Sequence, residues 1–242
     1  MRRMTLGALD LSVIDNNDAD TRYIYDEVFG SQIYHHSEFR IPNNPTIMDV
    51  GANIGLFTLW AHQKYQPQTI YCYEASPRTF AYLSDNIARL VDRKVTAVTA
   101  FNRAMASAAG ETLVLHQSTE VSGISTLLDR SKVSWIEKAF ASDRLETHEV
   151  MTSTLSAEIE ANRLAVVDIL KIDVEGYFLE VLKGIDPTDF PKIRNIVAEV
   201  DYLPETGIAP DAIEKILKQR GYKTDCFDRS QQNNLTFYAW RD

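Results

Sequence analysis

Short apolar runs alternate along the chain with segments in which apolar residues recur at helical spacing. Several runs end at an acid or a glycine, which is typical of strands that are buried on both faces of a parallel sheet. Helical spacing follows Ser76-Pro77, a pair that suits the start of a helix, and recurs over residues 211–220. This alternation predicts an α/β fold with a mostly parallel sheet that helices cover on both faces. The strand candidates are Ile47–Val50, Thr69–Tyr73, Val95–Phe101, Asp168–Ile172 and Ile193–Val200.

The last part of the chain predicts an antiparallel hairpin. Residues Tyr222–Phe227 and Leu235–Trp240 are strand-like, and Asn233-Asn234 supplies turn residues between them. We expect this hairpin to close the sheet. An extra strand is expected at Thr112–Leu115. Residues 117–147 are less regular, and a helix is expected there over Trp135–Phe140.

Residues 1–44 precede the first core strand and predict an N-terminal lid. Tyr23–Phe29 has mixed helical spacing, and Tyr34-His35-His36 follows Gly30. We expect a helical segment over residues 1–44 that packs over a ligand site in the domain spanning residues 45–242. A length of 242 residues fits one compact domain of this kind.

The segment Asp49-Val50-Gly51-Ala52-Asn53-Ile54-Gly55 joins the first core strand to a helix. Its glycines predict a tight turn where a ligand can approach bare backbone at the carboxyl end of a parallel strand. Glu74 ends the second strand, about 25 residues after Asp49, where an acid can accept hydrogen bonds from ribose hydroxyls. The pattern predicts a site for a nucleoside-containing cofactor. The alternative is a plain strand–turn–helix in which the glycines only relieve crowding.

The same turn argues against two common phosphate-binding sites. A dinucleotide site needs glycines spaced G-x-G-x-x-G and a P-loop needs a lysine, and this turn has neither. Asp49 would also repel a pyrophosphate. A carboxylate there suits the ammonium and sulfonium groups of S-adenosylmethionine, which is the cofactor we expect.

Composition limits the partners further. The formal net charge is −9, which argues against nucleic acid as the main partner because phosphate binding relies on Lys and Arg. The two cysteines, Cys72 and Cys226, form neither a disulfide framework nor a cysteine-rich metal site. No apolar run has the length of a membrane span or the form of a signal peptide, so we expect a cytoplasmic protein without a membrane partner.

Four segments resemble, in order and spacing, the FkbM family of S-adenosylmethionine-dependent methyltransferases. They are Asp49–Gly55, Tyr73–Pro77, Ser122–Leu127 and Leu170–Gly176, and the resemblance runs from about Thr21 to the C-terminus. It implies the Rossmann-like class I methyltransferase sheet, with seven strands of which the last is antiparallel. It also implies O-methylation of a hydroxyl on a small natural product, a sugar or a carrier-protein-bound intermediate. Ala52 and Asn53 depart from the general methyltransferase pattern Asp-x-Gly-x-Gly-x-Gly, as they do in the family.

In such an enzyme the glycine turn and the second strand would hold the cofactor. The methionine end and the ribose edge would lie against the turn, and Glu74 would accept from both ribose hydroxyls. Ala75 would pack on the adenine, and Asn102 either reaches the adenine edge or serves a turn. The residues expected to bind the cofactor are Asp49, Gly51, Asn53, Gly55, Glu74, Ala75, Asn102 and Asp173.

An alcohol is a poor nucleophile at neutral pH, so a base or a metal is expected near it. Asp173 and Glu199 end neighbouring strands of the expected sheet, where their carboxylates should converge. The alternatives are a helix cap for Asp173 and a solvated acid for Glu199. His36 could be a base that the lid delivers, although two adjacent histidines in a loop often face solvent.

The two carboxylates leave a choice between a metal ion and a direct base. They could hold a divalent cation such as Mg²⁺, with Asp201 as a third oxygen ligand. Without a metal they need a neighbouring cation, for which Lys171 is the candidate if the strand stays regular. We favour the base without a metal. N-methylation and a cofactor-binding partner subunit without activity remain alternatives to O-methylation.

Overall fold

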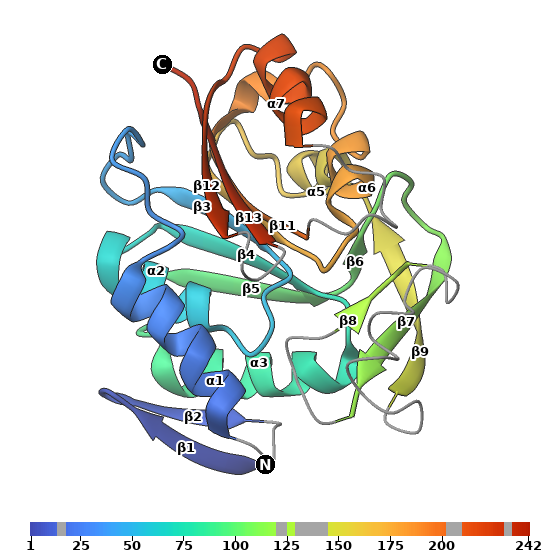
Figure 1. Cartoon of the computed structure of the whole chain (residues 1–242). Coiled ribbons are helices and arrows are strands. Elements are labelled where there is room, and N and C mark those ends of the chain that lie inside the picture. The colour runs from blue at the N-terminus through green and yellow to red at the C-terminus, as the bar shows by residue number, and fades with distance from the viewer. Residues whose placement is uncertain (14–17, 120–124, 129–144, 202–209, 230–233) are drawn as a thin grey trace.

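A seven-stranded sheet, in the order β12-β13-β11-β10-β3-β4-β5, forms the centre of the molecule (Figure 1). The computed structural model describes residues 1–13, 18–119, 125–128, 145–201, 210–229 and 234–242. Five neighbouring strands of this sheet run parallel, as the apolar runs predict. They are β3 (Thr46–Val50), β4 (Thr69–Glu74), β5 (Ala97–Asn102), β10 (Val167–Asp173) and β11 (Ile193–Asp201).

The last strand, β13 (Asn234–Trp240), lies inside the sheet and runs antiparallel to both of its neighbours, β11 and β12 (Lys223–Arg229). This order confirms the expected sheet, which is mostly parallel with an antiparallel last strand. It also confirms the predicted hairpin. The hairpin turn at Asn233 lies outside the described residues.

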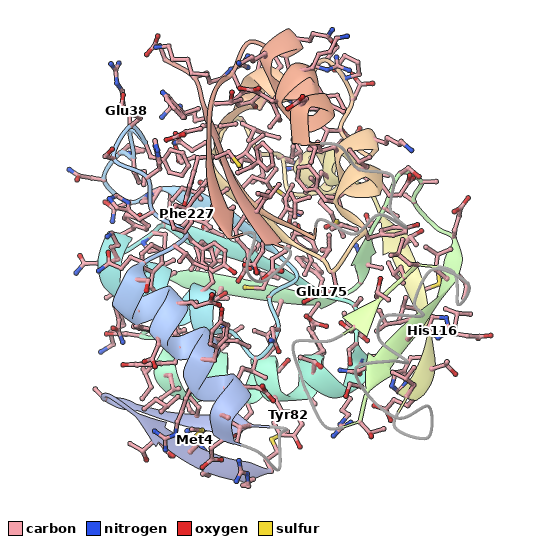
Figure 2. The ribbon with its side chains drawn as sticks, viewed as in Figure 1. Met4, Glu38, Tyr82, His116, Glu175 and Phe227 are labelled. Carbon is pink, nitrogen blue, oxygen red and sulfur yellow. The ribbon has the colours of Figure 1, made fainter. Side chains whose placement is uncertain are left out.

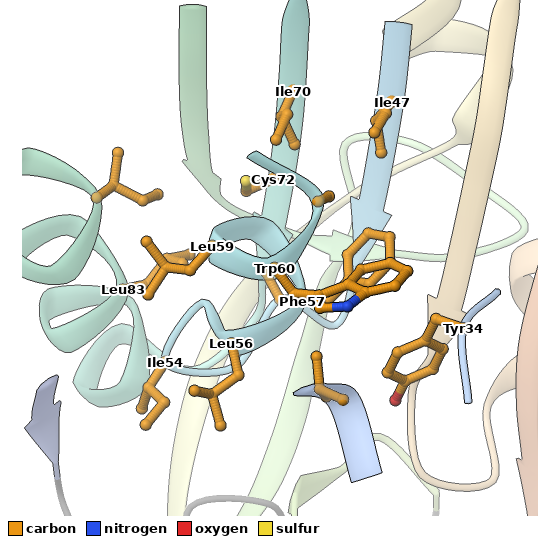
Figure 3. Packing of buried hydrophobic residues seen from close by; sticks show 14 of the residues in the cluster. Tyr34, Ile47, Ile54, Leu56, Phe57, Leu59, Trp60, Ile70, Cys72 and Leu83 are labelled. Atoms are coloured by element: carbon orange, nitrogen blue, oxygen red, sulfur yellow. The ribbon is translucent and has the colours of Figure 1, made fainter. Parts of the chain in front are cut away.

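Helices cover both faces of the sheet and divide the core into two clusters of buried apolar side chains. On one face, α2 (Leu56–Tyr65) and α3 (Pro77–Leu90) contribute to the first cluster, part of which Figure 3 shows. The start of α3 follows its sequence signal, because the Ser76 hydroxyl accepts from the N–H of Thr79 and Pro77 is the first helical residue. On the other face lie α5 (Leu155–Ala161), α6 (Phe178–Lys183) and α7 (Pro210–Gln219), and a short 3-10 turn at Phe190–Lys192 comes between α6 and β11.

The N-terminal segment differs from the expected helical lid. Its first residues form a hairpin, β1 (Arg2–Leu6) and β2 (Leu9–Val13), which turns at Gly7 with φ +55°. Alternating exposed and buried residues favour a strand there, so the helical expectation is wrong for residues 1–13. Helix begins only at α1 (Asp18–Tyr25) and continues as the π-helical η1 (Asp26–Ser31). In Figure 1 the hairpin lies at the bottom of the molecule, next to α1 and α3.

A second, smaller sheet follows β5 and has the order β6-β9-β7-β8. The expected extra strand is present as β7, and β9 was not expected from the sequence. The helix expected over Trp135–Phe140 lies outside the described residues. Figure 2 shows the described side chains on the ribbon in the same view as Figure 1. No helix in the described part of the chain has the length and apolar character needed to cross a membrane. The strands of the second, smaller sheet are β6 (Ala104–Met105), β7 (Thr112–Ser118), β8 (Ser125–Thr126) and β9 (Leu145–Ser153).

Candidate functional site

A pocket of about 300 Å³ opens at the carboxyl ends of the parallel strands. Its walls come from the ends of β3, β4, β10 and β11, from α1 and η1, and from the small sheet beside them. Open α/β sheets bind ligands at this edge, and the volume falls at the lower end of ligand pockets. The site therefore lies where the sequence motifs predict it.

The glycine turn after β3 is held tightly against the neighbouring strands. The N–H groups of Gly51 and Ala52 both donate to the Tyr73 carbonyl, at 2.9 and 3.0 Å. Gly51 has φ +73°, and a Cβ built on it would lie 1.7 Å from the carbonyl oxygen of Asp173. The glycine is thus required by the approach of β10, whereas the sequence suggested the approach of a ligand as the reason.

Glu74 lies at the end of β4 and lines the pocket, although its side chain is almost fully buried. Each carboxylate oxygen accepts one backbone N–H, Oε2 from Asn53 and Oε1 from Ser76, both at 2.9 Å. Burial raises the pKa of Glu74 to about 7, although these two N–H bonds act in the opposite direction. Each oxygen keeps a further acceptor position, as a contact to ribose hydroxyls would require.

Asp49 lies beneath the turn rather than in the pocket wall. It is fully buried, and its Oδ2 accepts from the Thr58 hydroxyl at 2.7 Å. Burial raises its pKa, while the ammonium of Lys171, 3.4 Å from Oδ1, and the Thr58 hydroxyl lower it. The cation that Asp49 meets is therefore a side chain of the protein. The expected contact with a cofactor cation has no support from this position.

Lys171 is a buried cation at the centre of the site. Its Nζ donates to the Gly51 carbonyl at 2.6 Å and lies 3.3 Å from Asp173 Oδ2. Lys171 and Asp173 share one face of β10 because the strand stays regular, as the base without a metal requires. Burial alone would lower the pKa of Lys171, but the carboxylates of Asp173 and Asp49 raise it above its ordinary value. The residue stays charged at neutral pH.

Asp173 and Glu199 meet at the ends of β10 and β11, where they are direct neighbours in the parallel register. Both line the pocket. Between them lies the hydroxyl of Tyr34, 3.0 Å from Asp173 Oδ2 and 3.2 Å from Glu199 Oε2. The Tyr34 ring is buried and packs edge-on against Phe57, with centroids 5.2 Å apart (Figure 3). Sequence reasoning placed Tyr34 in the lid but missed this contact.

His36 lies away from the pocket. Its ring stacks on Tyr238 and also contacts Trp240, with centroids 4.7 and 5.0 Å away. Its Nε2 lies 3.0 Å from Asp225 Oδ2 on β12. The loop that turns Tyr34 inward places His36 against the end of the sheet, so a base delivered by His36 has no support from this geometry.

Of the remaining residues expected to bind the cofactor, some line the pocket and others do not. Ala75, Asn53 and Gly55's neighbour Ile54 line the pocket, and Gly55, with φ +95°, precedes the first residue of α2. Asn102 is not among the lining residues, because its amide donates to the Glu74 and Ala75 carbonyls at 2.8 and 2.9 Å. This fits the alternative role in a turn.

Arg103, the residue after Asn102, lines the pocket, although the sequence did not single it out. Its guanidinium donates to the buried Glu158 at 2.8 Å.

The acid pair does not fit a divalent cation. The ammonium of Lys171 lies against Asp173 Oδ2, and the Tyr34 hydroxyl lies against that oxygen and Glu199 Oε2, so one oxygen of each carboxylate is engaged and a cation beside it would meet the ammonium charge. Among the side chains that the structure describes, no group of three or more His, Cys, Asp or Glu is arranged to hold a metal.

A family model and the names of three relatives found by sequence comparison all describe methyltransferases. The family described as "Methyltransferase FkbM domain" matches residues 49–224. The chain is 34% identical to methyltransferase sdnD of Sordaria araneosa over 84% of this chain and 82% of that protein. It is 32% identical to methyltransferase 1 of Beauveria bassiana, over 79% of this chain and 78% of that protein. It is 29% identical to the 31-O-demethyl-FK506 methyltransferase FkbM of Streptomyces tacrolimicus, over 76% of each chain.

Proposed function

The chain belongs to the FkbM methyltransferase family, and we propose that it uses S-adenosylmethionine to methylate a hydroxyl of a small natural product, a sugar or a carrier-protein-bound intermediate. The observation that carries the proposal is that one pocket holds both a candidate cofactor-binding wall and a candidate proton acceptor. Glu74 and the glycine turn lie on one side, and the acid pair Asp173 and Glu199 lies on the other. The name of the Streptomyces relative, which specifies a 31-O-demethyl compound, supports transfer to oxygen.

The wall around Glu74 suits the nucleoside of this cofactor. Besides the two open acceptor positions of Glu74, the Oδ1 of Asn53 is buried and has no hydrogen-bond partner in the described protein. A buried acceptor without a partner costs about 1–3 kcal/mol, which a ligand donor would offset. Ala75 packs against a small apolar cluster with Leu115 and Leu127, a surface that suits the adenine.

S-adenosylmethionine would supply an electrophilic methyl group on a sulfonium. The protein would align the acceptor oxygen with that methyl and keep water out. Ile24, Val28 and Phe57 give the pocket an apolar wall on the side of α1, η1 and α2, which serves this purpose. As the carbon–oxygen bond forms and the carbon–sulfur bond breaks, the acceptor proton would pass to one carboxylate of the acid pair.

Lys171 makes a metal unnecessary in this scheme. Two carboxylates side by side repel, and one of them would normally hold a proton. The buried ammonium 3.3 Å from Asp173 offsets this repulsion, so one carboxylate stays available as a base. We therefore expect turnover in the presence of EDTA. Loss of turnover in EDTA that Mg²⁺ restores would contradict this scheme.

The proposal is tested with labelled cofactor and a panel of alcohols and amines. We expect transfer of the labelled methyl group to an alcohol, identified as an O-methyl product by mass spectrometry. Asp173→Asn should abolish turnover while S-adenosylhomocysteine still binds in calorimetry. The matched control is Asp186→Asn, on an exposed loop outside the pocket lining, which should keep turnover. A product methylated on nitrogen, or no binding of S-adenosylhomocysteine, would overturn the proposal.

A further inference from the structure

The hydroxyl of Tyr34 joins two carboxylates that the chain brings from distant places. Tyr34 follows η1, whereas Asp173 and Glu199 lie 139 and 165 residues further along the chain. The two acids are Cα partners in the parallel pair of β10 and β11, so they face the same side of the sheet. The loop carries the phenol over the seam between these strands, at hydrogen-bond distance from both acids.

The phenol is held in this position by packing. Its ring is buried, contacts Phe57 edge-on, and lies with its centroid 5.5 Å from the Nζ of Lys171. The same loop is anchored to β13, because the Tyr238 hydroxyl donates to the Ile33 carbonyl at 2.7 Å. Burial and the two carboxylates raise the pKa of Tyr34 well above its ordinary value, so the hydroxyl keeps its proton at neutral pH. The phenol is therefore a fixed, neutral group.

The number of protons in this cluster determines how many hydrogen bonds form. When both carboxylates are ionised, the phenol has one proton for its two short contacts, so only one of these contacts is a hydrogen bond donated by Tyr34. A proton on either carboxyl oxygen facing the phenol makes both contacts hydrogen bonds. The charged groups that face the cluster are Lys171 on β10, which also lies 3.3 Å from Asp173 Oδ2, and Asp49 on β3.

From this geometry we propose that Tyr34 is a positioning residue that links Asp173 and Glu199 into one proton-accepting unit. The proton that leaves the acceptor hydroxyl is taken by one carboxylate. The Tyr34 oxygen accepts a hydrogen bond from that carboxyl group. Its own O–H donates a hydrogen bond to the other carboxylate and stays bonded to Tyr34. No net proton moves to or from Tyr34. The inference rests on the proposed function in taking the acid pair as the base, although the linkage itself can be measured without an acceptor.

The test measures how strongly the two acids titrate together. With the carboxyl carbons of Asp and Glu labelled, nuclear magnetic resonance follows Asp173 and Glu199, assigned through Asp173→Asn and Glu199→Gln. In the unchanged protein we expect both carbons to respond in the same pH steps, as coupled groups do. Glu199→Gln should then shift the titration midpoint of Asp173. In a Tyr34→Phe background we expect this shift to be at least halved.

The matched control is Tyr23→Phe. Tyr23 lines the same pocket, and its hydroxyl donates at 2.6 Å to Glu27, which lies on η1 and not on a strand end. In this background the shift of Asp173 should stay as large as in the unchanged protein. Tyr34→Phe keeps its buried ring, and binding of S-adenosylhomocysteine with unchanged affinity would verify its fold. Once an acceptor is known, Tyr34→Phe should lower kcat without a comparable change in that affinity.

Two results would overturn the proposal. One is that Glu199→Gln shifts the titration midpoint of Asp173 equally with and without the Tyr34 hydroxyl. The other, which needs no variant at Tyr34, is a separate single titration step for each acid in the unchanged protein. Failure of the proposed function is distinguishable, because no methyl product would form from any acceptor while the coupled titration would persist.

Discussion

Glu74 has almost no contact with solvent, and backbone N–H groups are its hydrogen-bond donors in the described structure. Its pKa of about 7 therefore lies near neutral pH. In the proposed site only the ionised carboxylate would accept from two ribose hydroxyls at once, so protonation of Glu74 would compete with cofactor binding. The folded-state pKa is raised, so affinity should be full above it and decline as the pH falls through it.

We predict that S-adenosylhomocysteine binds roughly tenfold more weakly at about pH 6 than at about pH 8. Isothermal calorimetry measures the affinity across this range. Glu74→Gln is the control, since it removes the titrating group while keeping the shape of the side chain. It should bind more weakly at every pH and lose the dependence on pH. An affinity that stays flat in the unchanged protein would remove Glu74 from the cofactor site.

Gly51 and Gly55 both have positive φ, but the space around them differs. Alanine at Gly51 would drive its Cβ to 1.7 Å from the Asp173 carbonyl oxygen. Alanine at Gly55 meets only a terminal methyl of Leu83, at 2.9 Å, which can move. Positive φ alone costs about 1–3 kcal/mol at either site. We predict that Gly51→Ala lowers the free energy of unfolding clearly more than Gly55→Ala, as denaturant titration measures. Equal losses of unfolding free energy would mean that the end of β10 moves away from the new Cβ at little cost.

The sequence predicts the acids better than it predicts their partners. Asp49, Glu74, Asp173 and Glu199 can be located because each stands at or near the end of a recognisable strand. The contacts that determine their roles depend on packing between distant segments, which no local pattern reports. Asp49 on β3 meets Lys171 on the neighbouring strand β10, and Tyr34 reaches Asp173 over 139 residues of chain.

At the scale of elements, α1 and η1 form one side of the pocket. Tyr23, Ile24 and Val28 from these helices line it, and η1 ends at Gln32 in the left-handed conformation. Helices that line a pocket and lie outside the sheet commonly order when a ligand binds. The expected role of the N-terminal segment as a lid thus stays a prediction with a defined location.

We predict slower amide exchange over residues 20–40 when cofactor and acceptor are bound, by roughly threefold or more. Hydrogen–deuterium exchange with mass spectrometry measures it. The hairpin β1–β2 is the internal control, because it belongs to the same N-terminal segment but does not line the pocket. Its exchange should not change. Equal exchange over residues 20–40 in both states would reduce the segment to a packing role.

Elements with a clear apolar pattern could be predicted whatever their length, since β3 with five residues was expected and β9 with nine was not. The five parallel strands and α3 carry clear apolar periods and caps. By contrast, α5 has seven residues, and its signal is the Thr154 side chain, which accepts from the N–H of Ala157. The hairpin β1–β2 was missed because five residues of mixed polar and apolar character in each strand are a weaker signal than a buried apolar run such as β3.

The whole molecule and the described pocket lining both carry an excess of negative charge. The net charge is −9, and the described lining includes more acids than bases. S-adenosylmethionine carries one net positive charge, whereas S-adenosylhomocysteine has lost the sulfonium and carries none. The field of the protein should therefore steer the first ligand and not the second. The lining acids are Asp20, Glu27, Glu74, Asp173, Glu175 and Glu199, and the lining bases are Arg103 and Lys171.

We predict that the association rate of S-adenosylmethionine falls roughly threefold or more between about 20 mM and about 500 mM salt, since salt screens charges beyond the Debye length. Stopped-flow fluorescence measures the rate. S-adenosylhomocysteine, nearly the same in shape, should show little change and serves as the control. The same dependence for both ligands would point to a salt effect on the protein rather than to steering.

The position of β13 has a consequence for how the enzyme is made. A ribosome releases the chain from its N-terminus, so β3 and its glycine turn emerge long before the strand that lies between β11 and β12. Until residues 234–240 emerge, β11 remains an edge strand, with unpaired main-chain groups beside Glu199 that another chain could capture. The half of the site for which we propose the proton-accepting role is thus paired only after the glycine turn has emerged. A nascent chain can complete its turn for the cofactor early and still be unable to act as an enzyme.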